Sequence, residues 1–225
     1  MPAILIATRN AHKVSEIRAI LGTQFQYMTL NDFPGAPKVV EDMDTFAGNA
    51  TKKAAELAEW LAAREAEAKP LPDFVLADDS GLEVDALNGA PGVFSARFAA
   101  LDSPHNSTDA DNNAKLLRLL KDVPLKKRTA RFRCVLAFAP IPSRKVEPAS
   151  PVCYAEGIES LTKLFDGVCE GRILFEPRGA NGFGYDPLFV PEGFKETFAE
   201  LGDGVKNKLS HRANAVERLK RSLGF

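Results

Sequence analysis

The chain has 225 residues, of which 45% are hydrophobic and 26% are charged, and its formal net charge is -1. This balance is typical of a globular protein, and it disfavours nucleic-acid-binding and membrane-surface proteins, which normally carry a basic excess. No apolar run approaches the length that spans a bilayer, and the N-terminus lacks the basic leader of a signal peptide. The three cysteines form no Cys-x-x-Cys pair, which disfavours a zinc site or a disulfide framework and predicts a cytoplasmic protein.

The first half of the chain predicts alternating strands and helices. Short apolar runs bounded by turn residues indicate the strands, and apolar residues at helical spacing indicate the helices. In chain order, the expected elements are a strand at 2–7, a turn at 8–10, a helix over about 14–21, a helix from Asp44 or Thr45 to about 61, a helix end and loop at 62–72, and strands at 74–77 and 82–87 on either side of a turn at Ser80 and Gly81.

The second half continues this pattern. Thr108 is expected to begin a helix, because Asp109 and Asp111 suit the positive end of the helix dipole. Residues 131–138 have the period of two that is typical of a strand. The remaining expected elements are an exposed loop at 140–151, strands at 152–158 and 172–175 in antiparallel hairpins, a tight loop with glycines at 179, 182 and 184, and a last helix from about Lys206 to Leu223. The fold class is therefore α/β.

Two adjacent carboxylates, Asp78 and Asp79, follow the apolar run at 74–77. Ending a buried strand in charge costs free energy unless the charge has a partner. In α/β proteins, ligands bind beyond such strand ends. Because neighbouring side chains in a strand point to opposite faces, we expect one of the two aspartates to face a given site. The alternative is a solvated turn.

Residues 8–13, Thr-Arg-Asn-Ala-His-Lys, lie where the first strand ends and the first helix begins, and Asn10 or Thr8 is available as the N-cap of that helix. A helix N-terminus offers backbone N–H groups and a partial positive charge. Together with an Asn, a hydroxyl and a Lys, it predicts a cradle for a triphosphate. The segment lacks the glycines of a P-loop, so a capped surface helix is the alternative.

The segment 41–54 carries a second set of charges. Glu41 is expected at a strand-to-helix junction, and Lys52 and Lys53 follow on a helix whose opposite face is apolar. Solvated lysines are the alternative. Asp42 and Asp44 have the spacing of an Asp-x-Asp phosphatase nucleophile, although Phe46 departs from that motif. A phosphomonoesterase is therefore kept as an alternative function.

Two later segments offer surfaces for a purine base. In the Gly-rich segment 178–187, glycines permit close approach of a ligand, and the rings of Phe183 and Tyr185 are flat faces for stacking. On the last helix, Lys208, His211 and Arg212 stand at i, i+3 and i+4 and are expected to share one face. The alternatives are a hairpin loop with core aromatics and an exposed basic patch.

Taken together, these segments resemble the inosine triphosphate pyrophosphatase family of non-standard purine nucleotide hydrolases. The motifs occur in the family's order and span nearly the whole chain. They are Thr8-x-Asn10-x-x-Lys13, Glu41 with Thr45-Phe46-x-x-Asn49-Ala50-x-x-Lys53-Ala54, Asp78-Asp79-Ser80-Gly81-Leu82, Ala90-Pro91-Gly92 with Ser95-Ala96-Arg97, Cys169-Glu170-Gly171-Arg172-Ile173, Gly182-Phe183-Gly184-Tyr185-Asp186-Pro187, and Lys208-x-Ser210-His211-Arg212. The loops 62–72 and 140–151 look longer than in the compact form of the family.

The resemblance implies an elongated α/β fold, with a central mixed sheet and flanking helices that form two lobes around a nucleotide-binding cleft. It also implies one domain spanning 1–225, a homodimer, and no nucleic-acid or membrane partner. The implied reaction cleaves ITP, dITP or XTP to the monophosphate and pyrophosphate, which cleanses the nucleotide pool. A non-catalytic purine nucleotide sensor on the same fold is a further alternative.

The resemblance also implies site residues. We expect Mg²⁺ at Glu41 and Asp79, because acidic residues cannot face a polyanion without a cation between them. Asp79 is the first candidate for activating the attacking water, and Asp78 is the second. The expected substrate-binding residues are Thr8, Arg9, Asn10, Lys13, Lys53, Ser80, Phe183, Gly184, Tyr185, Asp186, Lys208, His211 and Arg212. His211 and Arg212 are expected to donate to the keto oxygen that distinguishes hypoxanthine and xanthine from adenine.

Overall fold

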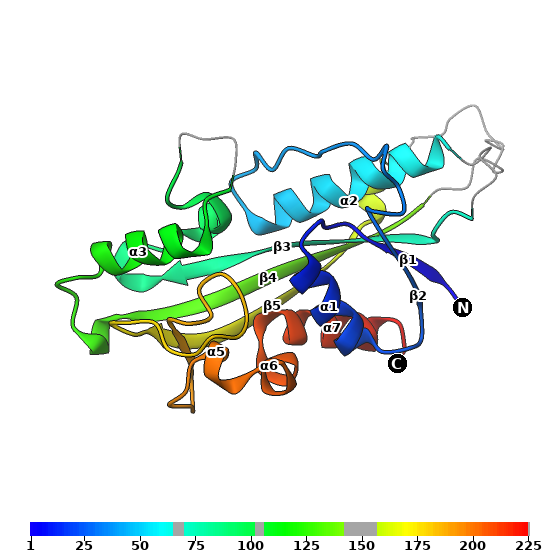
Figure 1. Ribbon diagram of the computed structural model, residues 1–225. Coiled ribbons are helices and arrows are strands. Elements are labelled where there is room, and N and C mark those ends of the chain that lie inside the picture. Colours follow the sequence, from blue (N-terminus) through cyan, green and yellow to red (C-terminus); the bar gives the residue numbers. More distant parts are fainter. Residues whose placement is uncertain (65–69, 102–105, 142–156, 225) are drawn as a thin grey trace. The chain divides into compact units, whose positions relative to one another are not determined.

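A computed structural model describes residues 1–64, 70–101, 106–141 and 157–224 of the chain. The chain divides into two compact units (Figure 1). The first unit comprises Met1–Asp79 and Val135–Phe165, and the second comprises Ser80–Cys134 and Asp166–Phe225. The chain therefore passes from one unit into the other three times.

The strands form one mixed six-stranded sheet in the order β2-β1-β3-β4-β5-β6. They are β1 Ala3–Ile6, β2 Gln26–Thr29, β3 Phe74–Val84, β4 Thr129–Pro140, β5 Lys163–Ile173 and β6 Phe189–Pro191. Strand β1 pairs in parallel with β2 and β3, whereas β5 and β6 are antiparallel. Flanking helices complete the α/β fold that the sequence predicts. Strands β2 and β6 are short and were not predicted.

The helices of the first unit begin at the predicted caps. Helix α1 spans Ala11–Leu21, and the Asn10 side chain accepts hydrogen bonds from the backbone N–H groups of His12 and Lys13. Helix α2 spans Phe46–Ala62, and the Thr45 hydroxyl accepts from Gly48 N–H. Such caps satisfy N–H groups that have no partner inside the helix. The two helices lie on opposite faces of β1 (Figure 1). A short helix, α4, spans Ile158–Leu161.

The second unit holds its own core. Its helices are α3 Asp109–Leu119, α5 Phe198–Leu201, α6 Asp203–Leu209 and α7 His211–Ser222, and its 3-10 turns are η1 Asp85–Leu87, η2 Gly92–Arg97 and η3 Leu125–Lys127. Three aromatic rings, from Phe132, Phe189 and Phe198, pack on one another in this core. The predicted helix start at Thr108 is confirmed, because its hydroxyl accepts from Asp111 N–H.

Strand β3 corrects the predicted turn at Ser80 and Gly81. The strand runs without interruption from Phe74 to Val84. Leu82 and Val84 are fully buried in the core of the second unit, so continuing the strand buries apolar surface that a turn would expose. The two aspartates therefore lie inside a strand and not at its end.

Strand β5 corrects the prediction of a strand at 172–175. The strand begins at Lys163 and ends at Ile173. Glycines weaken a strand prediction, yet Gly167 is required here because a Cβ at this position would lie 2.1 Å from the carbonyl oxygen of His211. Most of the strand predicted at 152–158 lies outside the described residues, as does most of the predicted loop at 140–151.

The last predicted helix is two helices. Ser210 has extended backbone angles, and its hydroxyl accepts from Ala213 N–H at 3.2 Å, which makes Ser210 the cap of α7. Apolar spacing alone did not reveal this break. Consequently, Lys208 ends on α6 while His211 and Arg212 begin α7, and the prediction that all three share one helix face is wrong.

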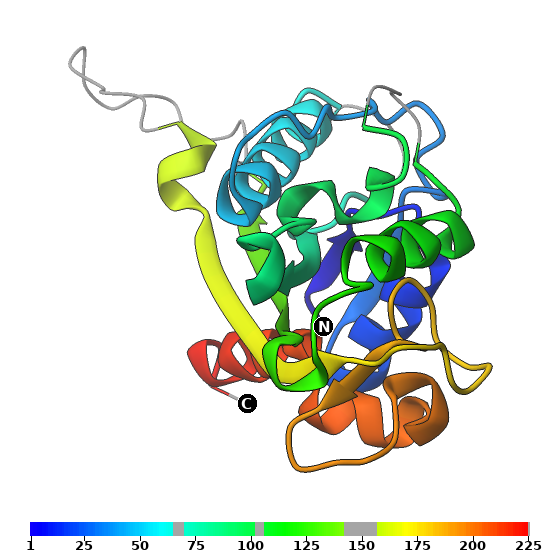
Figure 2. The same ribbon diagram turned by 90° about the vertical axis from the view of Figure 1, so that its left-hand side faces the viewer.

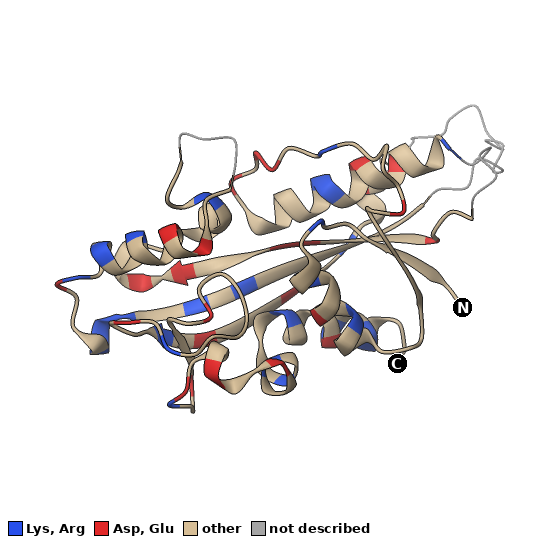
Figure 3. Cartoon of the chain, viewed as in Figure 1, with Lys and Arg blue, Asp and Glu red and all other residues tan. Residues whose placement is uncertain are grey.

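Charged side chains line part of the sheet in the second unit. The Arg131 guanidinium on β4 pairs with Asp85 at 3.0 Å and with Glu170 on β5 at 3.0 Å, and Figure 3 shows acidic and basic positions on these neighbouring strands. None of the helices in the described parts of the chain combines the length and apolar character that crossing a bilayer requires.

Candidate functional site

Asp78 and Asp79 in β3 are both buried, and each meets a different helix of the first unit. The Lys13 ammonium on α1 donates to Asp78 Oδ1 at 2.5 Å, whereas the Asn49 amide on α2 donates to Asp79 Oδ2 at 3.1 Å. Because α1 and α2 lie on opposite faces of β1, the alternation expected for neighbouring strand residues is confirmed.

Burial raises the pKa of Asp79 to about 6, and the charge of Glu41 acts in the same direction. The ammonium groups of Lys13 and Lys53 and the hydrogen bond from Asn49 oppose this rise. Burial wins because removing a carboxylate from water disfavours its charged form. A carboxyl whose pKa lies close to neutrality is suited to proton transfer.

Lys53 connects Glu41 to β3. Its ammonium forms an ion pair with the Glu41 carboxylate and donates to the backbone carbonyl oxygen of Asp78 at 3.0 Å. Glu41 itself lies in an irregular segment, so the predicted strand-to-helix junction at this residue is wrong. What brings Glu41 to the site is the lysine of the following helix and not a strand.

Residues 8–13, the predicted phosphate cradle, lie at the start of α1. The Thr8 hydroxyl accepts from Asn10 N–H, and the Asn10 side chain in turn caps α1. Lys13 reaches Asp78, so Thr8, Asn10 and Lys13 are grouped at the start of α1. The Arg9 guanidinium instead donates to the carbonyl oxygen of Ala36 at 3.5 Å. No group of three or more His, Cys, Asp or Glu side chains suited to a metal ion occurs among residues 1–64, 70–101, 106–141 and 157–224.

Asp42 and Asp44, the pair of the alternative phosphatase reading, are both exposed. The Asp42 carboxylate pairs with Lys52 at 2.6 Å, and this hydrogen bond lowers the pKa of Asp42. A solvated surface ion pair explains both residues without a nucleophilic role.

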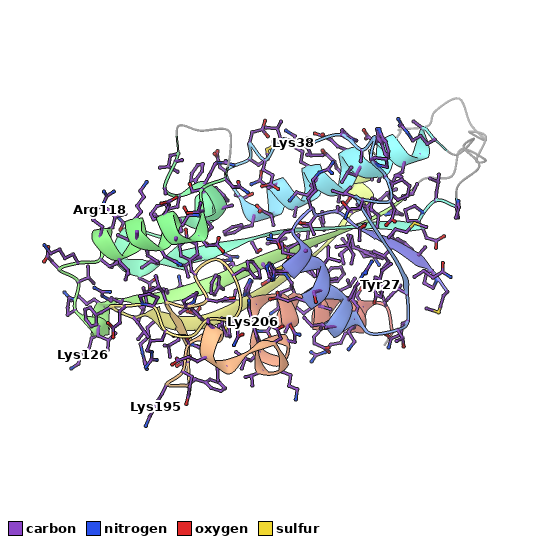
Figure 4. The ribbon with its side chains drawn as sticks, viewed as in Figure 1. Tyr27, Lys38, Arg118, Lys126, Lys195 and Lys206 are labelled. Atoms are coloured by element: carbon purple, nitrogen blue, oxygen red, sulfur yellow. The ribbon has the colours of Figure 1, made fainter. Side chains whose placement is uncertain are left out.

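In the second unit, a buried ion pair fixes the Gly-rich segment. Asp186 Oδ2 accepts from the Lys206 ammonium at 2.5 Å and from Phe183 N–H at 2.9 Å. The Lys206 ammonium also lies 4.5 Å from the centroid of the Phe183 ring. Lys206 is labelled on α6 in Figure 4. The charge of Asp186 therefore holds the loop beside Phe183, and a contact of Asp186 with substrate stays a prediction.

Two further predicted residues begin α7. The Arg212 guanidinium donates to Ser80 Oγ at 3.0 Å and lies 6.0 Å from the Phe183 ring centroid. The His211 ring stacks on Phe132 at 4.8 Å. Both side chains are buried, which contradicts the alternative of an exposed basic patch, whereas Lys208 on α6 is exposed.

The structure corrects the prediction for Tyr185. Its ring is only 4% exposed and belongs to the core of the second unit, and its hydroxyl donates to the carbonyl oxygen of Ser95 at 2.9 Å. The expectation that Tyr185 offers a face for stacking is therefore wrong, because core side chains cover the ring. Phe183, which is half-buried, keeps that role as a prediction.

Sequence reasoning missed Lys206 and Asn49 as site residues. Lys206 and Lys208 lie in the same helix and look alike in the sequence. Only the fold shows that Lys206 is buried whereas Lys208 is exposed. Asn49 lies within one of the motifs quoted for the family, directly before the apolar face of α2. Its position on the buried side of a helix was the available signal, because a buried amide requires a partner.

Comparisons with known proteins identify the family of the chain. A model of the Ham1 family matches residues 4–222. A dITP/XTP pyrophosphatase of Shouchella clausii is 42% identical over 223 residues, which cover 99% of this chain and 97% of that protein. A dITP/XTP pyrophosphatase of Desulforamulus reducens is 46% identical over 216 residues, which cover 96% of this chain and 92% of that protein.

Solved structures give the same result. The structure of a HAM1 protein from Coxiella burnetii superposes with a TM-score of 0.76 at 36% identity, covering 99% of this chain and 98% of that one. Both the family model and the relatives span almost the full length, so the resemblance drawn from the motifs is confirmed. The chain belongs to the Ham1 family.

Proposed function

We propose that the chain is a nucleoside-triphosphate pyrophosphohydrolase that cleaves deaminated purine nucleotides, ITP, dITP and XTP, to the monophosphate and pyrophosphate. The observation that carries the proposal is the buried carboxyl of Asp79. Its pKa lies near neutrality, and the charges of two lysine ammonium groups act to lower it. Phosphoryl transfer requires positioning and charge neutralisation more than covalent chemistry, and this set supplies both. The names of the relatives support the substrate class.

A divalent cation fits the carboxylates of Glu41 and Asp79. The charge of Glu41 raises the pKa of Asp79, so the two groups repel each other, and a cation held by both would remove that repulsion. Carboxylate oxygens are ligands that Mg²⁺ prefers, and Mg²⁺ keeps several waters or phosphate oxygens besides its protein ligands. When bound, such an ion would polarise water and phosphate oxygens. We propose Mg²⁺ as this cation.

The reaction requires a water molecule to attack the α-phosphorus and lose a proton. Asp79 is the group proposed to accept that proton, because its pKa of about 6 leaves it ionised at neutral pH while still basic enough to act. Lys13 and Lys53 would neutralise the phosphates. Both lysines are held by carboxylates in the structure, so the phosphates would compete with Asp78 and Glu41 for them.

The residues proposed for the base belong to the second unit. Phe183 offers a ring for stacking, and Arg212 lies beside it with its guanidinium fixed by Ser80. Guanidinium and imidazole donors match a keto oxygen but meet the amine of adenine donor-to-donor. By analogy with base reading in nucleic acids, one such contact gives about 1–3 kcal/mol of discrimination, which accounts for rejection of ATP.

A product assay tests the proposal. ITP, dITP, XTP, GTP and ATP are each incubated with the protein, with and without Mg²⁺, and the products are separated by anion-exchange chromatography. We expect monophosphate and pyrophosphate from ITP, dITP and XTP only when Mg²⁺ is present. Release of orthophosphate would favour the phosphomonoesterase built on Asp42 and Asp44, and binding without turnover would favour a nucleotide sensor.

Neither alternative is favoured by the family, but the assay separates all three. We also propose a homodimer located in the cytoplasm, on the resemblance alone. Light scattering behind a size-exclusion column measures the mass in solution. A mass close to the 24.4 kDa of one chain would contradict the dimer.

A further inference from the structure

Helix α3 holds both backbone groups of Gly184, the residue that follows Phe183. The Gly184 N–H donates to Asp109 Oδ2 at 2.6 Å, and the Gly184 carbonyl oxygen accepts from Asn113 Nδ2 at 3.0 Å. Residues four apart on a helix share a face, so both contacts come from one side of α3. Figure 2 shows the ribbon of the Gly-rich segment passing beside this helix. Gly184 has a φ of +62°, a conformation that glycine adopts at low cost.

These two contacts complete the support of Phe183. On the next residues, Asp186 accepts from Phe183 N–H and is itself held by Lys206. The backbone on both sides of the Phe183 ring is therefore fixed, by α3 through Gly184 and by α6 through Asp186. A shift at Gly184 would move the ring relative to Arg212, which lies 6.0 Å from the ring centroid.

Helix α3 is itself anchored, so it can serve as a fixed support. The Asn112 side chain accepts from Ala99 N–H at 2.8 Å and donates to the carbonyl oxygen of Ala96, at the end of η2. The Lys115 ammonium donates to the carbonyl oxygen of Phe98 at 2.5 Å. One face of α3 thus contacts the η2 region while another face contacts the Gly-rich loop.

Helix stabilisation alone does not explain Asp109. The start of α3 is already capped, because the Thr108 hydroxyl accepts from Asp111 N–H and donates to the Asp111 carboxylate at 2.6 Å. The Asp109 carboxylate is directed to the loop instead. Similarly, Asn113 Oδ1 is buried and makes no hydrogen bond within the described part of the chain, so the amide of this side chain is committed to Gly184.

We infer that Asp109 and Asn113 are positioning residues that set the base preference of the enzyme by fixing Gly184 and, through it, the Phe183 ring. The inference rests on the proposed function and adds two residues that themselves contact no substrate. Hydrogen bonds to charged groups are stronger than those between neutral groups, so the loss of the Asp109 contact is expected to change the position of the ring and with it the base preference.

The test compares D109A with D111A, a matched control that removes the same charge from the same turn of α3. For each variant, kcat and KM are measured with ITP and ATP, and the dissociation constant of IMP is measured by calorimetry. We expect D109A to raise KM for ITP and the IMP dissociation constant about tenfold, to lower the ITP-to-ATP preference, and to change kcat little. D111A should keep all these values.

Two further variants guard against misfolding. Asn at position 109 can still accept from Gly184 N–H, so D109N should recover most of the preference, and N113A should show the D109A effect. Because both residues act on Gly184, the effects of D109A and N113A should be less than additive. If D109A does not fold, as judged by circular dichroism, D109N and N113A give the test.

The outcomes separate this inference from the proposed function. If the unaltered protein does not cleave ITP, the proposed function is wrong. If it prefers ITP, and folded D109A and N113A keep that preference and the wild-type KM, the proposed function stands and the positioning role is excluded. Equal losses in D109A and D111A would likewise reduce Asp109 to a helix-stabilising residue.

Discussion

The two candidate groups of residues use buried charge in different ways. In the first unit, the lysine partners of Asp78 and Glu41 keep some contact with solvent, with side-chain exposures of 17% for Lys13 and 12% for Lys53. In the second unit, Lys206 and Asp186 are each only 2% exposed. We propose that the first set exchanges partners when a polyanion binds, whereas the second is sealed from solvent and fixes the backbone. Reactive charge and structural charge are thus separated along the chain.

The largest expected effect tests the reactive set. Asp79→Asn removes the proposed proton acceptor and cation ligand, so we expect kcat with ITP and Mg²⁺ to fall by about a thousandfold or more. Stability at pH 8 should be unchanged or higher, because Asn avoids the cost of a buried carboxylate. Steady-state kinetics and thermal melting measure the two quantities.

Asp42→Asn is the control for this variant, since Asp42 is exposed and forms a surface ion pair with Lys52. Its kcat should equal that of the unaltered protein. Near-normal turnover in Asp79→Asn at saturating Mg²⁺ would exclude Asp79 from the mechanism. A large loss of kcat in Asp42→Asn would favour the alternative function of a phosphomonoesterase.

The next effect tests the sealed pair. Lys206→Met leaves the Asp186 carboxylate buried without its ammonium, which typically costs about 3–5 kcal/mol of unfolding free energy. Lys208→Met is the matched control, because Lys208 lies two residues away on α6 and is exposed. Urea denaturation measures both variants. Equal, small losses would show that the pair contributes no fixed support to the Phe183 loop.

The pH dependence of the unfolding free energy tests the burial of Asp79 in the first unit. The pKa of Asp79 is raised from 3.8 to about 6, so the folded state binds this proton more tightly than the unfolded state. The stability that this group contributes is present below pH 4 and is lost as pH rises through 6. We therefore expect the unfolding free energy of the metal-free protein, relative to Asp79→Asn, to fall by about 3 kcal/mol at most between pH 4 and pH 7.

Mg²⁺ competes with that proton, so its stabilising effect should be greater at pH 7 than at pH 5. Denaturation series at both pH values, with and without the ion, measure this difference. If the difference in unfolding free energy between the unaltered protein and Asp79→Asn does not change with pH across this range, burial does not raise the pKa of the Asp79 carboxyl.

The smallest expected effect concerns the base. Arg212→Ala should raise KM for ITP and lower the ITP-to-ATP preference by about tenfold, in line with the loss of one base contact. Arg221→Ala, at the exposed end of the same helix, should leave the preference intact. Kinetics with both nucleotides provide the measurement, and an unchanged preference in Arg212→Ala would exclude this guanidinium from base reading.

Sequence predictions succeeded where the structure depends on contacts between residues close together in the sequence. Asn10, Thr45 and Thr108 were identified as caps or helix starts because a cap depends on a few neighbouring residues. Asp78 and Asp79 stood out because two charges interrupt an apolar run. These local signals were enough to find the acidic part of the site and the α/β class.

The failures depend on contacts between distant segments. The burial of Lys206 and the covering of Tyr185 are set by residues remote in sequence, so neither differs locally from an exposed lysine or a stacking ring. The glycines of β5 disfavour a strand prediction. Only the fold shows that the His211 backbone approaches Gly167 too closely for any side chain there. The break at Ser210 was the exception, because a serine inside a helical pattern is a recognised cap signal.

The threefold passage of the chain between the units has a consequence for protein engineering. Each unit is assembled from two segments that are far apart in sequence, so no single cut separates one whole unit from the other. A truncation after Asp79, for example, would remove the returning piece 135–165 that completes the first unit. We expect such fragments to require co-expression with the remainder of the chain in order to fold.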